Sequence, residues 1–396
     1  MLRLSGAPQR FAWGTVDAIP KLINQPSDGQ PYAEYWLGAY PLAPAVSDAG
    51  PLHEYIAANP QVLGRKSELS FGAQLPFLMK VLSAAHPLSL QAHPDRGLAV
   101  EGYARENALG IPLDDPSRSY KDAWPKPELL VAVSPFETLT GFRPPEQTAE
   151  LFEGLGLNRD LASVIGPLRE RKGAAAIAEV FLDALSLNGD RQHLMDVSAA
   201  AFVKHVKDPG PVGEFARTAL RLDDVFPGDG AILAALLLNR ITLRPGEAVF
   251  IKPGTMHVHL SGTGVEVMAN SDNVVRGGLT RKHIDVTELV RVVDFEPVTP
   301  QIIQPELVEP GVETYPVDVE EFTVWRLQLS PDYGRVTLPG EGSARILFVV
   351  AGSASVSTGP ETNTLAHGEA VFLGADETDV RISGDATAFV SASGLR

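Results

Sequence analysis

The chain has 396 residues, 44% of them hydrophobic, which is enough to bury a large core and to form two or three domains. Its 33 basic and 49 acidic residues give a formal net charge of −16, without a long basic run, which argues against nucleic acid or an acidic membrane surface as a partner. The chain contains no cysteine, which excludes disulfides, thiolate metal ligands and a cysteine nucleophile.

The first 90 residues are predicted to form loops and short strands. The stretch 32–41 (YAEYWLGAYP) has strand character, and 77–85 (FLMKVLSAA) is apolar almost throughout, which is typical of a buried strand. The amino terminus has no apolar core of signal-peptide length, and no run of about 18 apolar residues occurs, so we expect a cytoplasmic protein.

Two candidate metal ligands lie in the stretch LSLQAHPD. Gln91 and His93 are two residues apart, so on a strand their side chains would share one face. An amide oxygen and an imidazole nitrogen can both bind a divalent metal. A hydrogen-bonded structural histidine is the alternative, and the metal interpretation depends on Glu128 and His257 further along the chain. Residues 97–110 then predict a short helix that ends at Gly110.

The next segments change from strand to helix and back. Glu128 begins a predicted strand directly after two prolines, and its alternative reading is a solvated strand end. From about Pro145 to Asn239 the apolar residues recur at helical spacing, as at Ile177, Val180, Phe181, Ala184 and Leu185, so residues 146–239 are predicted to form a helical insert. Residues 240–250 return to strand character.

An internal repeat occupies the second half of the chain. The sequence GEAVF occurs at 246–250 and again at 368–372, and the same offset aligns other turn residues. Both copies read as strands joined by glycine turns, which predicts a jelly-roll unit built twice. His257 of the first copy aligns with Asp379 of the second, so any metal is assigned to the first copy.

Two further features follow in the first copy. His257 and His259 would face the same way on a strand, and with Glu266 they resemble the metal-binding pattern of cupin barrels; two core histidines are the alternative. The segment 266–282 then gathers charged side chains, including Arg276 and Lys282, that could clamp a phosphate, unless it is simply a solvated loop.

Together these stretches resemble the metal-dependent phosphomannose isomerases of the cupin class. The motifs SLQAHPD, KPE and SDNVVRGGLT occur in order at fitting separations, and the similarity covers most of residues 10–300. The resemblance implies a mainly β fold of two cupin-type jelly-roll domains with an inserted α-helical domain. The catalytic cupin domain would comprise 1–145 with 240–320, the insert 146–239, and a C-terminal cupin-like domain without metal ligands 321–396.

The resemblance also implies a site. One Zn²⁺ per chain would be bound by Gln91, His93, Glu128 and His257. The catalytic residues would be Lys126, Asp272 and Arg276. The substrate would be bound by Ser89, Lys282, Lys80 and Glu266. The partner would be a small-molecule sugar phosphate, and the protein would be a monomer or homodimer. The reaction would link fructose 6-phosphate to the synthesis of nucleotide-activated (GDP-) mannose.

The sequence departs from this family at one position of interest. Where the family usually has Asn-His-Lys-Pro-Glu, this chain has Trp-Pro-Lys-Pro-Glu, so Pro125 replaces a histidine that has been proposed to open the sugar ring. His259, where the family commonly has tyrosine, and His86 are the imidazoles that remain available nearby.

The ligand types suit the reaction that the resemblance implies. An aldose–ketose isomerisation moves a proton between adjacent carbons through an enediol, and a cation held by mostly neutral ligands would stabilise the charge that develops on oxygen. Two other classes stay open. A cupin oxygenase would favour an iron site without a glutamine ligand, and a non-catalytic sugar-binding module would keep the basic clamp without needing the metal ligands.

Overall fold

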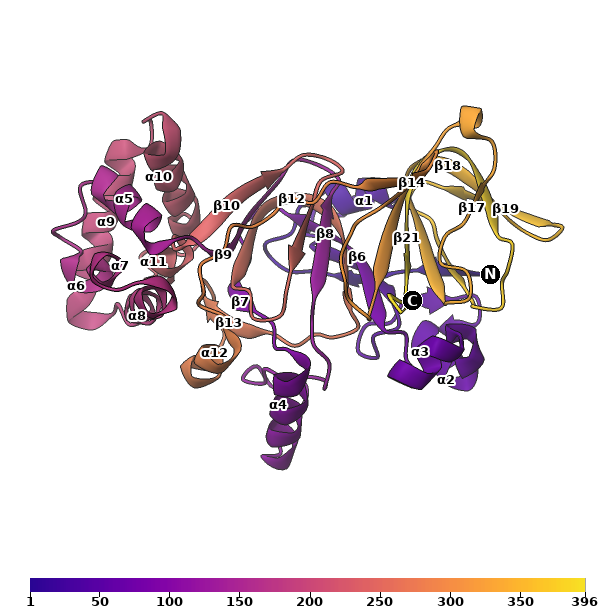
Figure 1. The fold of residues 1–396 in the computed structure, drawn as a ribbon, viewed down its shortest axis with the longest axis horizontal. Helices are drawn as coiled ribbons and strands as arrows, with labels where there is room; N and C mark the ends of the chain where they lie inside the picture. Colours follow the sequence, from indigo (N-terminus) through magenta and orange to yellow (C-terminus); the bar gives the residue numbers. More distant parts are fainter. Residues whose placement is uncertain (396) are drawn as a thin grey trace.

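The computed structural model describes residues 1–395, and its strands form two antiparallel sheets (Figure 1). Arg396, the last residue of the predicted C-terminal unit, lies outside the described residues. The ten strands of the first sheet are β2 (Ala7–Gln9), β3 (Glu34–Gly38), β6 (Phe77–Ala84), β7 (Leu90–Ala92), β8 (Glu128–Ala132), β9 (Phe136–Phe142), β10 (Leu238–Leu243), β11 (Ala248–Ile251), β12 (His257–Ala269) and β13 (Val275–Gly278). The prediction of a mainly β fold is therefore confirmed.

The second sheet has eleven strands and draws on both ends of the chain. They are β1 (Leu2–Ser5), β4 (Val46–Ser47), β5 (Gly50–Pro51), β14 (Glu306–Glu309), β15 (Val312–Thr314), β16 (Thr323–Leu329), β17 (Val336–Thr337), β18 (Arg345–Thr358), β19 (Glu361–Ala366), β20 (Ala370–Leu373) and β21 (Arg381–Ala392). β1 pairs with β20, so the first strand of the chain extends the C-terminal sheet, although we had expected it in the catalytic unit.

Helices connect the strands in the first third of the chain. They are α1 (Ala18–Leu22), α2 (Leu52–Ala58), η1 (Pro60–Leu63), α3 (Arg65–Phe71) and α4 (Arg96–Ala108). The helix predicted to end at Gly110 is confirmed as α4, and Gly110 has a φ of +71°. The sequence did not predict α1–α3, because helices of five to seven residues are too short to show a 3.6-residue period.

Consecutive helices fill the region that was predicted to be helical. They are α5 (Pro145–Gly154), α6 (Ala162–Ile165), α7 (Pro167–Glu170), α8 (Gly173–Leu185), η2 (Gly189–Arg191), α9 (His193–His205), α10 (Gly210–Asp223) and α11 (Ala231–Ala235). They gather at one end of the molecule, and β14–β21 lie toward the other end (Figure 1). The remaining helices are α12 (Val286–Val292) and η3 (Pro331–Tyr333). None of the helices in residues 1–395 combines the length and apolar character needed to cross a membrane.

The internal repeat is visible in the turns before β11 and β20. Gly246 and Gly368 both take a left-handed φ, of +89° and +83°. The glutamate that follows each glycine accepts a backbone N–H from three residues earlier in the chain. The two GEAVF segments therefore build the same turn, as the repeat predicted.

Strand register extends the repeat to the proposed metal ligands. Ile251 of β11 lies opposite Glu128 of β8, and the repeat partner of Ile251, Leu373 of β20, lies opposite Arg345 of β18. Arg345 therefore holds in the second copy the position that Glu128 holds in the first, and its side chain is fully buried. A guanidinium cannot ligate a cation, because it has no acceptor lone pair.

One glycine of β12 is required by close packing. Gly262 has a φ of +120°, and a Cβ there would lie 2.6 Å from the Pro135 carbonyl oxygen and 2.7 Å from the Phe136 Cα. We expect Gly262→Ala to lower the free energy of unfolding by about 2–5 kcal/mol, from a backbone penalty of about 1–2 kcal/mol and overpacking of about 1–3 kcal/mol. Equilibrium unfolding in urea measures this difference in the free energy of unfolding. Gly29→Ala is the control, because Gly29 also has a positive φ but open space around it; an equal loss in both variants would contradict the packing argument.

Candidate functional site

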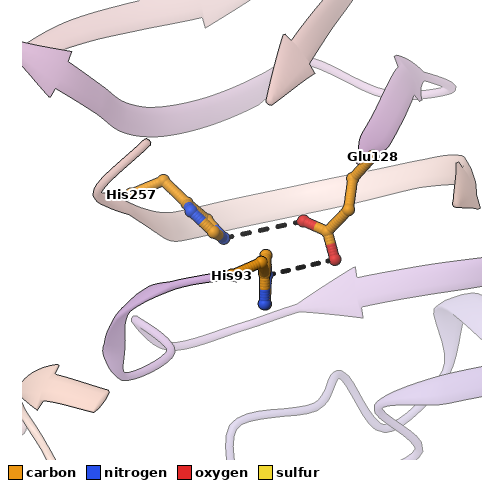
Figure 2. A group of neighbouring side chains, drawn as sticks. All are labelled: His93, Glu128 and His257. Atoms are coloured by element: carbon orange, nitrogen blue, oxygen red, sulfur yellow. Dashed lines mark ion pairs between the residues drawn. The ribbon is translucent and has the colours of Figure 1, made fainter. Parts of the chain in front are cut away.

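Three side chains from separate segments converge in the first sheet (Figure 2). His93 follows β7, Glu128 begins β8 and His257 begins β12. The Nε2 atom of His93 lies 3.3 Å from Oε1 of Glu128, and Nε2 of His257 lies 3.6 Å from Oε2 of the same carboxylate. Their candidate ligand atoms all lie within 4.8 Å of one another, and all three residues are buried. These are three of the four predicted metal ligands.

The outer nitrogens of both imidazoles are already fixed by backbone carbonyls. Nδ1 of His93 lies 2.8 Å from the Asn273 carbonyl oxygen, and Nδ1 of His257 lies 3.1 Å from that of Thr255. With Nδ1–H donating in each ring, the Nε2 lone pairs point to the interior, where Nε2 of His93 is buried without a hydrogen-bond partner. An orphaned imidazole nitrogen beside a second imidazole and a carboxylate fits a divalent cation.

Gln91 lies next to this group. It pairs with His257 in the sheet, and its side-chain amide nitrogen is 3.4 Å from Nε2 of His257. The amide oxygen and nitrogen of a glutamine exchange places on a half-turn, so Gln91 can present its oxygen as a fourth ligand. His93 lies one residue beyond the end of β7, so the expectation that both residues share a strand holds only for Gln91.

The charges of the group suit a cation. Burial opposes ionisation of Glu128, but its interactions with His93 and Lys126 outweigh burial and hold the pKa of this carboxyl well below its ordinary value. Burial, together with the neighbouring His93, lowers the pKa of His257 to about 3. At neutral pH Glu128 is therefore an anion and His257 a neutral acceptor, as a metal ligand set requires. The solvated strand end considered for Glu128 is wrong, because its side chain is buried.

A cavity of about 650 Å³ opens beside the three residues. The predicted site residues on its wall are Lys80, Ser89, Gln91, Lys126, Glu128, Glu266, Asp272, Arg276 and Lys282. Residues drawn from five separated stretches of the sequence thus face one space. The volume exceeds that of a hexose phosphate, so the cavity can admit one.

One wall of the cavity holds a buried ion-pair network. Nζ of Lys80 lies 2.6 Å from Glu266 and 3.1 Å from Glu34, and Glu34 also accepts the indole N–H of Trp36 at 2.7 Å. Burial opposes the charge on Lys80, but Glu266 and Glu34 outweigh it and raise its pKa. Glu266 therefore forms an ion pair with Lys80 and is not a member of the three-residue metal group.

Another part of the cavity wall, which we call its basic end, carries Lys121, Arg276 and Lys282. Burial lowers the pKa of Arg276, and burial together with Arg276 and Lys121 lowers the pKa of Lys282. Lys121 forms an ion pair with Asp272 at 2.6 Å. A cation whose pKa is lowered by neighbouring cations, as that of Lys282 is, is stabilised by an anion, so this end of the cavity favours a phosphate. A wholly solvated loop is wrong for this region, because Asn273 is fully buried.

The imidazoles that could replace the missing family histidine differ in their contacts. Nδ1 of His259 lies 3.0 Å from the Thr138 hydroxyl, and its Nε2 lies 3.5 Å from Glu266. His86 also lines the cavity. Pro125 supplies no imidazole, so His259 is the ring held beside the Lys80 network.

Comparisons with known proteins agree with this geometry. Residues 1–145 match the model described as phosphomannose isomerase type I, catalytic domain, and residues 311–393 match the mannose-6-phosphate isomerase cupin domain. The mannose-6-phosphate isomerase of Escherichia coli K12 is 37% identical, with 97% of each chain covered. The chain belongs to the mannose-6-phosphate isomerase family.

Other members of the mannose-6-phosphate isomerase family are similar over nearly their whole length. The human enzyme is 32% identical, over 95% of this chain and 93% of the human one. A crystal structure of mannose 6-phosphate isomerase from Salmonella typhimurium, in the apo form, is 34% identical with a TM-score of 0.90, covering 100% of this chain and 99% of that one. A zinc-bound crystal structure of mannose 6-phosphate isomerase is 33% identical with the same TM-score and the same coverage.

Several cavity residues of this mannose-6-phosphate isomerase family member were not predicted from the sequence. Lys121, Trp36 and Glu34 lie on the wall, as does Phe226 from the helical region. Lys121 could have been found, because it precedes the KPE motif by only a few residues. Phe226 could not, because no local pattern links a turn between two helices to a distant cavity.

Proposed function

We propose that this chain catalyses the reversible isomerisation of D-mannose 6-phosphate to D-fructose 6-phosphate with one bound Zn²⁺. The observation that carries the proposal is the orphaned Nε2 of His93, which faces His257 and Glu128 at the edge of a cavity with a basic end. Membership of the mannose-6-phosphate isomerase family supports the same substrate.

Each predicted residue has a role in this proposal. Gln91, His93, Glu128 and His257 would hold the zinc, which when bound stabilises negative charge on a substrate oxygen. Ser89 and Lys282 would bind the phosphate at the basic end, with Arg276 beside them. The Lys80–Glu266 pair would bind sugar hydroxyls, since both residues line the same cavity.

We propose that the proton moves between the two carbons through a cis-enediol with Lys126 as the transferring group. Nζ of Lys126 lies 3.3 Å from Oε1 of Glu128, so it stands beside the metal ligands and still lines the cavity. Asp272, whose pKa is lowered by Lys126 and Lys121 against the effect of burial, would keep the neighbouring cations oriented.

We also propose the domain organisation that the sequence suggested. Residues 146–239 would be a helical insert within the catalytic cupin domain of 1–145 and 240–320, since Leu238 of β10 pairs with Phe142 of β9 and the chain thus returns to the strand it left. Residues 321–396 would form the cupin-like unit without metal, since Arg345 stands where the first copy has Glu128. We also propose that the protein is a cytoplasmic monomer or homodimer whose reaction supplies GDP-mannose synthesis. Light scattering would measure its oligomeric state.

Metal removal tests the proposed function directly. Thorough chelation should reduce mannose 6-phosphate turnover to background in a coupled assay for fructose 6-phosphate, because the charge on the substrate oxygen then lacks its counter-ion. Returning zinc should restore the rate. Activity that survives chelation would overturn the proposal. Binding of the sugar phosphate without turnover would favour the binding module, and oxygen uptake with ferrous iron would favour the oxygenase.

A further inference from the structure

Two segments outside the helices and strands meet next to His93. One of them, 121–127, leads into β8 and ends directly before Glu128, and the other, 270–274, connects β12 with β13. Backbone groups in such segments have no partners in a helix or sheet, so side chains or water must supply them. Asn273 supplies partners here, and its side chain is fully buried.

The side-chain amide of Asn273 binds the backbone of the segment before β8. Its Oδ1 accepts the N–H of Lys121 at 2.7 Å and that of Asp122 at 3.1 Å. Its Nδ2 donates to the carbonyl oxygens of Asp122 and Trp124, each at 2.9 Å. The two N–H groups can only donate and the two carbonyls can only accept, so these contacts determine which way the amide is turned. One side chain thereby holds the backbone of 121–124.

The backbone carbonyl of the same asparagine holds a proposed zinc ligand. It lies 2.8 Å from Nδ1 of His93, and because a carbonyl oxygen only accepts, the imidazole proton belongs on Nδ1 and the lone pair on Nε2. The N–H of Asn273 donates to the Ser271 hydroxyl at 3.3 Å, and that hydroxyl donates to Oδ1 of Asp122 at 2.7 Å. Side chain and backbone of Asn273 are therefore both tied to the segment 121–124.

The segment that Asn273 holds also carries cations of the cavity wall. Lys121 forms an ion pair with Asp272 at 2.6 Å, and both residues line the cavity. The N–H of Asp272 donates to Oδ2 of Asp122 at 3.0 Å, which adds a further bond between the two segments. Lys126 follows in the same segment and lines the same cavity. Asn273 thus links the orientation of His93 to the segment that presents Lys121 and Lys126.

We propose that Asn273 is a positioning residue for zinc binding. Its carbonyl keeps His93 in the tautomer whose Nε2 lone pair faces Glu128, and its side-chain amide keeps that carbonyl in place by binding the segment 121–124. The amide acts on the zinc through His93 and does not touch the metal group itself. This inference rests on the proposed function only in taking the cation to be zinc.

Zinc affinity tests the proposal. Asn273→Ala should weaken zinc binding by about 10- to 100-fold, the usual cost of losing a group that orients a ligating imidazole. Competition with a chelator, starting from zinc-stripped protein, measures the affinity without turnover. Asn270→Ala is the matched control, because Asn270 lies in the same segment and is buried, but its amide oxygen has no hydrogen-bond partner among residues 1–395. The control should bind zinc as the wild type does, and an equal loss in both variants would overturn the inference.

A second variant separates zinc binding from stability, because Asn273→Ala removes several hydrogen bonds of a buried side chain. Asn273→Asp has nearly the same shape and keeps Oδ1, but it places an oxygen where Nδ2 donated to two carbonyls. It should also weaken zinc binding, measured well below the unfolding temperature of the zinc-free variant. If either variant unfolds at a lower temperature but binds zinc as tightly as the wild type, the role of Asn273 is structural and the inference is wrong.

The tautomer of His93 gives a readout that needs neither zinc nor turnover. Nitrogen-15 spectra of the zinc-free wild type should show the proton of this ring on Nδ1, with His93→Ala used to assign the signal. Asn273→Ala should show a mixture of both tautomers, because Nδ1 then has no acceptor held in place. A single Nδ1–H tautomer in Asn273→Ala would contradict the inference. A wild-type protein that binds no zinc would refute the proposed function, and these spectra would still test the role of Asn273.

Discussion

A His257→Ala variant is expected to lose its zinc and its isomerase activity together. The imidazole is one of three buried groups whose ligand atoms lie within 4.8 Å, and its removal leaves His93 and Glu128 as the remaining two members of that group. Loss of a group that only orients a ligand already costs about 10- to 100-fold in metal affinity, so loss of the ligand itself should cost at least about 100-fold. Elemental analysis after dialysis and the coupled assay measure the two losses.

His259→Ala is the matched control for this experiment. His259 lies two residues further along β12 and is also buried, but it contacts Thr138 and Glu266 and lies outside the three-residue group. Its replacement should leave one zinc per chain, whatever it does to the rate. Full zinc content in His257→Ala would show that the ligand assignment is wrong.

The parts of the fold that sequence predicted are those with a local signal. The apolar spacing of Ile177, Val180 and Phe181 indicated a helix because all three residues of α8 face one core. The second GEAVF predicted a repeated turn because Gly246 and Gly368 both need a left-handed conformation. The ligand set came from the family resemblance, since spacing alone left structural histidines open as an alternative.

The parts that sequence could not predict depend on strand register and long-range packing. Lys80 lies opposite Trp36 of β3 and Glu266 of β12, and only this register brings Glu34, Lys80 and Glu266 into one network. The pairing of β1 with β20 joins the two ends of the chain in one sheet, and its four residues carry no mark of their partner. The positive φ of Leu279 has no signature in the sequence either, because leucine is disfavoured in that conformation.

A Lys126→Met variant is expected to lower kcat by about 10²- to 10⁴-fold, the usual contribution of general acid–base catalysis. Methionine keeps an unbranched apolar stem of similar length in this buried position but removes the ammonium. The zinc should stay bound, because the ammonium lies 3.3 Å from Oε1 of Glu128 and competes with a cation for that oxygen. Steady-state kinetics at saturating mannose 6-phosphate and zinc analysis on one preparation separate the two effects.

Lys66→Met provides the control, because Lys66 is exposed on α3 and its replacement should leave kcat, KM and zinc content unchanged. If Lys126→Met keeps kcat within about 3-fold of the wild-type value, then another group moves the proton. Removal of the group that transfers the proton should lower kcat by much more than that. His259 would then be the next candidate, because it lines the same cavity and contacts Glu266. If zinc is lost with the lysine, the ammonium instead helps to hold Glu128 in place, and its role is to orient a ligand.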